Sequence, residues 1–288
     1  MPTDPAAAGP AAPAPDPDPA MLLRLATSIA EEAGQLLLER LDQERTAVAT
    51  KSSLTDMVTD ADRASEALIL GRLGNERPGD EVLTEEAGDL PGSTRVRWVV
   101  DPLDGTTNYL YRFPAWSVSV AAQLDGATVA GAVRDPARAI TFSALAGHGS
   151  WQNGQPLLLS SPPPLERALV GTGFAYDAGR RAWQAQVLTA VLPAVRDVRR
   201  AGSAALDLCF VGAGHLDAFY ESGIQAWDRA AGLLVASEAG AWVGGLDGGP
   251  PTTELTIATH PALAEPLRQL LARAWTEAPP PRGSSLAS

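Results

Sequence analysis

The chain contains little cysteine and no long apolar run. Cys209 is the single cysteine among 288 residues, so no intrachain disulfide can form. No uninterrupted apolar stretch is long enough to cross a bilayer, and the N-terminus lacks the basic start and apolar centre of a secretion signal. We therefore expect a soluble, cytoplasmic protein with no membrane partner.

Positive charge is also scarce. There are 22 lysines and arginines against 34 acidic residues, which gives a net charge of -12. Nucleic-acid binding needs clustered basic residues, so a nucleic-acid partner is not expected. An acidic protein can still bind a phosphate when a metal ion supplies the positive charge. Lys51 is the single lysine, which indicates a place where a compact ammonium is wanted rather than a planar guanidinium.

Composition divides the chain into four segments. Residues 1–20 are rich in Ala, Pro and Asp, and residues 277–288 resemble them, so we expect two disordered tails. Residues 21–160 predict an α+β half, and residues 161–276 predict an α/β half that completes the active site. The expected fold class is therefore α+β / α/β, with layers of helix and sheet.

Apolar periodicity predicts the individual elements of both halves. Asp18-Pro19 and Thr59 are the expected helix caps, the latter in a capping box with Asp62. In the first half we predict helices over 21–42 and from 59, strands over 81–84 and 96–100, and a meander over 117–124, 128–133 and 140–144. In the second half we predict strands over 168–171, 218–220, 241–243 and 255–258, and helices over 178–195, 203–211, 228–239 and 261–275.

Asp101 and Asp104 come at the end of an apolar strand. Pro102 is expected to stop further strand pairing there, and Gly105 permits a tight backbone turn. Two carboxylates held close together repel each other, and a hard cation such as Mg²⁺ relieves this repulsion. Amides around Gly105 and Thr106 would then face an anion if a helix begins there. The alternative is an ordinary loop, in which Asp104 makes an Asx turn and Asp101 caps a neighbour.

Other acidic residues favour the metal site over the ordinary loop. Each lies at a predicted strand end or helix start, where the active sites of open sheets are found. They are Glu85-Glu86 after a strand, Asp228 after Trp227 at a helix start, and Asp56 and Asp62 after Lys51.

These segments together resemble the inositol monophosphatase family of metal-dependent, lithium-sensitive phosphatases, and the resemblance is closest to the bacterial inositol-1-monophosphatases. It covers about residues 21–275. The matching motifs are residues 101–109 (Asp-Pro-Leu-Asp-Gly-Thr-Thr-Asn-Tyr), 227–232 (Trp-Asp-Arg-Ala-Ala-Gly), Glu85-Glu86, and Lys51-Ser52-Ser53 with Asp56 and 59–62. One departure is Thr84, where the family usually has glycine. We expect a slightly altered backbone there rather than a lost metal ligand.

The resemblance implies a layered α-β-α-β-α sandwich of the sugar-phosphatase type and a homodimer. It implies a phosphoric monoester hydrolase that converts inositol 1-phosphate to inositol and phosphate by a metal-activated water. Two to three Mg²⁺ ions per site are implied, with Mn²⁺ as an alternative. Arg199-Arg200 is the basic pair that we note near the pocket, whereas a nucleotide bisphosphate would need more basic groups.

The resemblance also implies a role for each site residue. Glu85, Asp101 and the carbonyl of Leu103 would bind one metal. Asp101, Asp104 and Asp228 would bind the second. The catalytic groups would be Asp62 and Thr106, which orient the water, together with Glu85. The substrate would be bound by Asp104, Gly105, Thr106, Gly202, Ser203, Ala204, Glu221 and Asp228, and Lys51 and Asp56 belong to the N-terminal motif nearby.

Two kinds of alternative remain open. Within the family they are the phosphatases for histidinol phosphate, 3′-phosphoadenosine 5′-phosphate and fructose 1,6-bisphosphate. Outside catalysis, the same fold can serve as a non-catalytic regulatory binding protein. The intact acidic set argues against that role, because a scaffold has no reason to cluster unpaired acids.

Overall fold

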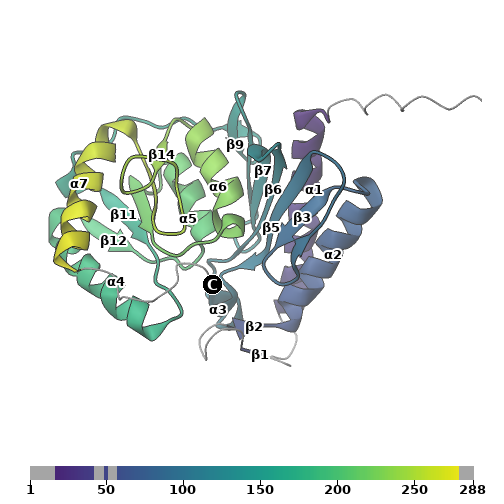
Figure 1. The fold of residues 1–288 in the computed structure, drawn as a ribbon, viewed down its shortest axis with the longest axis horizontal. Helices are drawn as coiled ribbons and strands as arrows, with labels where there is room; N and C mark the ends of the chain where they lie inside the picture. Colours follow the sequence, from purple (N-terminus) through teal and green to yellow (C-terminus); the bar gives the residue numbers. More distant parts are fainter. Residues whose placement is uncertain (1–16, 42–48, 51–56, 279–288) are drawn as a thin grey trace, which may run out of the picture.

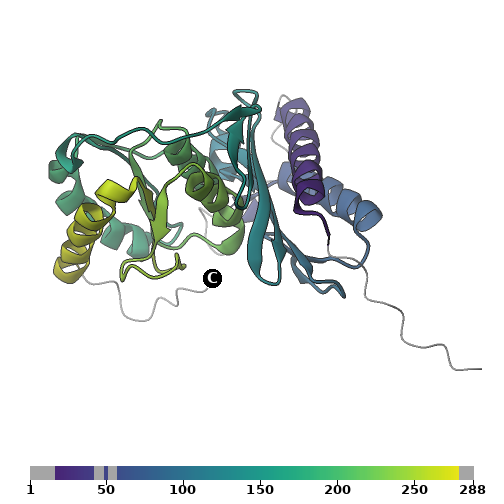
Figure 2. The same ribbon diagram turned by 90° about the horizontal axis from the view of Figure 1, so that it is seen from above.

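The computed structural model describes residues 17–41, 49–50 and 57–278. Its layers run α-β-α-β-α, as Figures 1 and 2 show, which confirms the expected fold class. One outer layer contains α1 (Pro19–Leu41) and α2 (Asp60–Glu76), the middle layer α5 (Ala204–Gly212) and α6 (Ala226–Glu238), and the other outer layer α4 (Ala178–Val191) and α7 (Pro261–Glu277). Separate hydrophobic clusters of buried side chains fill the spaces between neighbouring layers.

The first sheet has eight strands in the described part of the chain. In spatial order they are β10 (Gln155–Pro156), β9 (Gly149–Gln152), β8 (Ile140–Leu145), β7 (Ala127–Asp135), β6 (Ser117–Leu124), β5 (Val96–Asp104), β3 (Glu81–Thr84) and β4 (Gly88–Leu90). Strands β6, β7 and β8 form the predicted antiparallel meander. Its first turn has positive φ at both Asp125 and Gly126, as a tight hairpin requires.

Strand β5 continues past Pro102, so the prediction that pairing stops there was wrong. Asp101 pairs with Ser119 of β6, and Asp104 pairs with Ser117, with a register shift between the two pairs. One more residue lies on β5 than on β6 over this interval, which is the geometry of a β-bulge. A bulge accommodates a proline because the residue in it needs no ladder hydrogen bond.

The helix caps follow the sequence signals. Asp18 accepts a hydrogen bond from the amide of Ala20 at the start of α1. Thr59 and Asp62 form the predicted capping box of α2. Buried residues such as Leu22, Ile29 and Leu37 recur on one side of α1, which therefore packs against the first sheet.

The second sheet has the spatial order β12 (Asp197–Arg199), β11 (Leu169–Thr172), β13 (Ala218–Glu221), β15 (Thr256–Thr259) and β14 (Trp242–Gly244). Strands β12, β11 and β13 are parallel, and β15 and β14 pair antiparallel. The helix predicted over 178–195 ends at Val191, where a 3₁₀ turn with a proline follows (Leu192–Ala194). Shorter elements are β1 (Ala49–Thr50), β2 (Met57–Val58), the 3₁₀ turn Leu165–Arg167, and α3 (Thr106–Leu110).

Some predictions fall outside the described residues or are not tested by them. Lys51, Asp56 and most of both predicted tails lie outside the described ranges, although α1 already begins at Pro19. The division near residue 160 stays a prediction. No helix among the described residues has both the length and the apolar character needed to span a membrane.

Candidate active site

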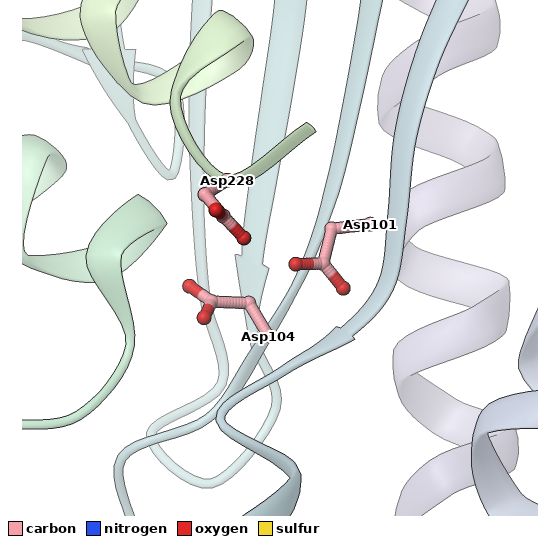
Figure 3. Close-up of side chains that lie close together, drawn as sticks. All are labelled: Asp101, Asp104 and Asp228. Carbon is pink, nitrogen blue, oxygen red and sulfur yellow. The ribbon is translucent and has the colours of Figure 1, made fainter. Parts of the chain in front are cut away.

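Three carboxylates from two layers meet at one point. Asp101 and Asp104 lie at the end of β5, and Asp228 lies in the first turn of α6, as Figure 3 shows. One oxygen from each of the three side chains lies within 4.8 Å of the others. Asp101 and Asp104 are buried, and Asp228 is half-buried. The structure therefore brings together three of the four predicted carboxylate ligands.

The fourth predicted carboxylate, Glu85, borders the same cleft. It follows β3 and lines a cavity of about 330 Å³ together with the Asp101–Asp104–Asp228 cluster and Leu103. Its negative charge raises the pKa values of Asp101 and Asp228 further than burial alone. Glu85 thus acts electrostatically on the cluster from the edge of β3.

Burial and mutual repulsion hold these carboxyls at raised pKa values. Burial is the largest cause at all three positions, and it raises the pKa of Asp104 to about 6. The pKa values of Asp101 and Asp228 are raised well above the ordinary value, and neighbouring carboxylates contribute at both. Such a cluster is unfavourable in its ionised form unless a cation joins it.

Each clustered carboxylate is also fixed by local hydrogen bonds. Asp101 accepts a bond from the amide of Leu103 at 3.0 Å, so the Asx-type turn belongs to Asp101 and not to Asp104. Asp228 accepts a bond from the amide of Gln225 at 2.5 Å in a capping box. The sequence predicts that this helix begins at Asp228. It begins at Ala226 instead, so Asp228 is its third residue.

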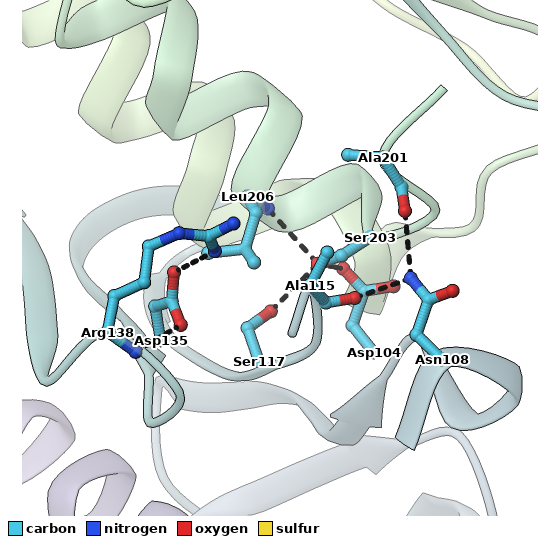
Figure 4. Close-up of polar contacts among 9 residues, drawn as sticks. All are labelled: Asp104, Asn108, Ala115, Ser117, Asp135, Arg138, Ala201, Ser203 and Leu206. Atoms are coloured by element: carbon cyan, nitrogen blue, oxygen red, sulfur yellow. Dashed lines mark hydrogen bonds and ion pairs between the residues drawn. The ribbon is translucent and has the colours of Figure 1, made fainter. Parts of the chain in front are cut away.

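Asp104 is held by the start of α5. Its Oδ2 atom accepts bonds from Ser203 Oγ at 2.6 Å and from the amide of Ala205 at 2.8 Å. Ser117 Oγ lies 3.1 Å from Ser203 Oγ and continues this chain of hydroxyls, as Figure 4 shows. Ser203 is buried and is not among the residues that line the neighbouring pocket; its side chain orients Asp104.

Gly105 allows the chain to turn from β5 into α3. Its φ of 92° is in the left-handed region, and an added Cβ would lie 3.0 Å from the carbonyl oxygens of Ala115 and Gly202. Just beyond it, Asn108 donates to the carbonyls of Ala115 at 2.6 Å and Ala201 at 2.8 Å (Figure 4). These bonds join α3 to the segment that carries Ser203. A helix therefore does begin after Gly105, as the anion-binding prediction required.

Thr106 and Asp62 are in contact. Thr106 Oγ lies 3.0 Å from Asp62 Oδ1 and 3.1 Å from the carbonyl oxygen of Leu103. The other oxygen of Asp62 accepts from the amide and the hydroxyl of Thr59. The capping box of α2 thereby fixes the carboxylate that faces Thr106, and both side chains are buried.

Thr84 is accommodated at the end of β3. It is fully buried and keeps its pairing with Val100 of β5. Its hydroxyl donates to Glu66 at 2.8 Å, and Glu66 also accepts from the amide of Ala87 at 3.0 Å. Glu66 thus closes the turn that carries Glu85, so the strand end remains regular with threonine in the usual position of glycine.

A second cavity of about 200 Å³ opens beside the carboxylate cluster. Asp104 and Asp228 form one wall, and Gly202, Ala204 and Glu221 form others. Burial, followed by the charge of Asp207, raises the pKa of Glu221 to about 8. Three of the four residues predicted to line an alcohol pocket therefore line one common cavity, and Ser203 lies behind it.

The residues present fit a hard divalent cation. Carboxylate oxygens are the ligands that such a cation prefers, and ligand oxygens within 4.8 Å of one another can share one ion at ordinary metal–oxygen distances. The raised pKa values of the same groups show that their ionised forms are unfavourable when buried side by side, and a bound cation would relieve this cost. Asp101, Asp104 and Asp228 can hold it, with Glu85 at the edge of the cluster.

Sequence reasoning missed several residues of the second cavity. Tyr176 lines both cavities, and Arg180 of α4 reaches the second one. Asp207 of α5 lines neither cavity, but it is buried and its charge acts on Glu221; its Oδ1 atom has no hydrogen-bond partner in the described part of the chain. Arg200 was noted only as part of a basic pair. The apolar periodicity of α4 gives no sign that its polar face borders a cavity.

Comparison with known proteins agrees with this geometry. The profile of the inositol monophosphatase family matches residues 18–278. The inositol-1-monophosphatase SuhB of Mycobacterium tuberculosis is 47% identical over 247 residues, which is 80% of this chain and 85% of that protein. The Nus factor SuhB of Escherichia coli is 38% identical over 230 residues, 79% of this chain and 86% of that protein. The structure of Mycobacterium tuberculosis SuhB has a TM-score of 0.78 at 43% identity and covers 90% of this chain and 98% of its own. The chain belongs to the inositol monophosphatase family.

Proposed function

We propose that this chain is a Mg²⁺-dependent phosphomonoesterase that hydrolyses inositol 1-phosphate to inositol and phosphate. The observation that carries the proposal is the buried Asp101–Asp104–Asp228 cluster between two cavities. Family membership and the printed name of the mycobacterial relative support the reaction and the substrate.

In the proposed site, Glu85, Asp101 and the Leu103 carbonyl would hold one cation, and Asp101, Asp104 and Asp228 would hold a second. Bound Mg²⁺ would supply the positive charge that the phosphoryl oxygens need and would make a water molecule more acidic. The protein's own groups position the reactants.

Thr106 and Asp62 are proposed to orient the attacking water. The Thr106 hydroxyl can accept a hydrogen bond from the water while it donates to Asp62 at 3.0 Å. Asp62 keeps its orientation because Thr59 donates to its other oxygen. The amides of Gly105 and Thr106 would donate to the phosphate. Hydrolysis of this type depends mostly on positioning and charge.

The alcohol part of the substrate would occupy the second cavity. Glu221 is proposed to bond the hydroxyls of inositol, with Gly202 and Ala204 giving close approach. The cavity of about 200 Å³ is smaller than the roughly 300 Å³ at which pockets for drug-sized ligands begin, which favours a small alcohol over a nucleoside.

The test is phosphate release from inositol 1-phosphate at fixed Mg²⁺, with Asp104→Asn beside the wild type. We expect the variant to lose at least about a hundredfold in kcat/KM, because it removes a charge from the cluster. Asp89→Asn is the matched control, since Asp89 is exposed and pairs with Arg97 away from both cavities. Unchanged turnover by Asp104→Asn would refute the metal assignment.

A second candidate is a non-catalytic regulatory binding protein. The printed name of the Escherichia coli relative, Nus factor SuhB, supports it. Absence of turnover on inositol 1-phosphate, histidinol phosphate and fructose 1,6-bisphosphate, by a folded wild type with Mg²⁺, would favour this candidate. A homodimer also stays a proposal, which light scattering coupled to size-exclusion chromatography tests directly.

A further inference from the structure

Two short loops face each other across the second cavity, which is the proposed alcohol cavity. Residues 173–177 follow β11 and form the first wall, and residues 222–225 follow β13 and form the second wall. Both walls also reach the cavity of the carboxylate cluster, through Tyr176 on one side and Gly223 and Gln225 on the other. Since β11 and β13 are neighbouring parallel strands, the walls leave the sheet at the same edge, where open α/β sheets bind ligands.

The β-ladder between the two strands ends before the walls begin. Its last pair is Thr172 with Tyr220. Backbone amides and carbonyls beyond the ladder still need partners where they lose contact with water. Gln184 of α4 supplies one on each side: its Oε1 atom accepts from the amide of Ala175 at 2.8 Å, and its Nε2 atom donates to the carbonyl of Ser222 at 3.1 Å. One side-chain amide thus takes the place of a peptide group between the two walls.

Gln184 lies behind the walls and outside the substrate space. It is only 6% exposed, and it is not among the described residues that line either cavity. Together with Val187, Tyr220 and Trp275 it borders a void of about 10 Å³, which holds at most roughly one water molecule. The amide therefore has little room to leave its two partners.

The two walls approach each other closely at Glu221, the last residue of β13. A Cβ added at Gly173 of the first wall would lie 2.0 Å from Oε2 of Glu221. The hydroxyls of a bound polyol must reach Glu221 and the walls at hydrogen-bond distance, about 2.5–3.0 Å. Movement of one wall by about 1 Å is enough to lose such a bond.

The start of α4 also contacts each wall separately. Arg181 donates to the carbonyl of Tyr176 at 3.0 Å, and Arg180 donates to Ser222 Oγ at 3.1 Å. Arg180 lines the alcohol cavity, so a change there would alter the substrate surface as well as the walls. A change at Gln184 alters the connection between the walls and leaves that surface in place.

We propose that Gln184 is a positioning residue that ties the two walls together, sets the width of the alcohol cavity and so favours a small polyol. This inference rests on the proposed function, since it concerns the alcohol side of the same site. Without the tie the walls can move apart, which weakens the bonds to the alcohol hydroxyls. The carboxylate cluster should stay in place, because separate hydrogen bonds hold Asp101, Asp104 and Asp228.

The kinetic test compares a leaving group that carries hydroxyls with one that carries none. Gln184→Met keeps a similar volume but removes both hydrogen bonds, and Gln184→Ala also removes the bulk of the side chain. With Mg²⁺, both should raise KM for inositol 1-phosphate about tenfold, the worth of about one hydrogen bond, and keep kcat within about threefold. For p-nitrophenyl phosphate, kcat/KM should stay within about threefold of the wild type. Gln186→Ala, on the exposed side of the same helix, is the matched control and should behave as the wild type.

A general structural role would give a different pattern. Parallel losses on both substrates, a lower kcat at unchanged KM, or a wild-type KM in Gln184→Met would each overturn the proposal. Thermal melting of each variant checks that it is folded.

Hydrogen exchange tests the tie without any substrate. In both Gln184 variants the amides of residues 173–177 and 222–225 should exchange about tenfold faster than in the wild type, with no change in α1. Unchanged exchange in the walls, or faster exchange throughout the chain, would overturn the tie. If the wild type hydrolyses no phosphomonoester, the proposed function fails, and exchange still decides about Gln184. Faster exchange confined to the walls would then support the tie in a protein without that activity.

Discussion

Replacing Asp104 by asparagine should stabilise the metal-free protein while it removes the response to magnesium. Burial raises the pKa of Asp104 from 3.8 to about 6, so its ionisation opposes folding. This shift corresponds to about 3 kcal/mol at pH 8. The asparagine oxygen can still accept from Ser203 and Ala205, but its buried amide donors cost about 1 kcal/mol.

The net gain should therefore be about 2 kcal/mol, which raises Tm by about 4–8 °C for a domain of this size. The sign with pH follows from the raised pKa. A carboxyl with a raised folded pKa destabilises the fold as pH rises above the unfolded value, and the effect is complete above about pH 6. At pH 5 the wild-type carboxyl is mostly protonated in the fold, so the ionisation penalty should shrink to about half its value and the net difference between the two proteins to about 0.6 kcal/mol.

The assay is thermal unfolding in EDTA at pH 5 and pH 8, and then with Mg²⁺. An excess of Mg²⁺ of one hundred times its Kd should add about 2.7 kcal/mol to the wild type and much less to the variant. The order of stability should therefore reverse between EDTA and saturating Mg²⁺. If Asp104→Asn is less stable than the wild type in EDTA at pH 8, or if both proteins respond equally to Mg²⁺, the reasoning is wrong. Asp89→Asn should show neither effect.

Other substitutions test separate parts of the site. Thr106→Val removes the hydroxyl that bonds Asp62 and should lower kcat for inositol 1-phosphate about a hundredfold with little change in KM, whereas Thr106→Ser should keep most of the rate. Gly173→Ala places a Cβ 2.0 Å from an oxygen of Glu221, so it should raise KM for inositol 1-phosphate about tenfold; an unchanged KM would contradict the role of that carboxyl. Asn108→Ala leaves the buried carbonyl of Ala115 and the half-buried carbonyl of Ala201 without their donor and should lower the free energy of unfolding by about 2–3 kcal/mol in urea, and a loss below about 1 kcal/mol would contradict this.

Local signals in the sequence predicted most of the helices and strands. The capping box at Thr59 and the alternating strand at 117–124 depend on neighbours within a few residues, and both are found as predicted. The path of β5 through Pro102 was not predictable in this way, because it depends on a bulge against β6. The short strands β4, β9, β10 and β12 were missed, since their pairing partners and not their composition define them.

The same distinction between local signals and long-range contacts decides which site residues were predictable. Asp101, Asp104 and Asp228 were predicted because they stand in recognisable motifs, and the structure brings them together. The hydrogen bond from Ser203 to Asp104 joins residues 99 positions apart, and no spacing rule reveals it. Arg180 was missed for a similar reason. An amphipathic pattern tells which face of α4 is apolar, but it does not tell what the polar face borders.

The close packing of α5 against α6 has a consequence for how this protein can vary in evolution. A Cβ added at Gly232 of α6 would lie 2.8 Å from Cβ of Leu208 and 3.0 Å from the carbonyl oxygen of Ala205. Asp228 lies in the first turn of α6, and Ala205 in α5 holds Asp104, so the spacing of these helices sets the spacing of two proposed ligands. Natural selection for magnesium affinity would therefore also act on interior positions that never touch an ion. Bulky replacements at Gly232 should be selected against because they would move the two proposed ligands apart, even where the fold tolerates them.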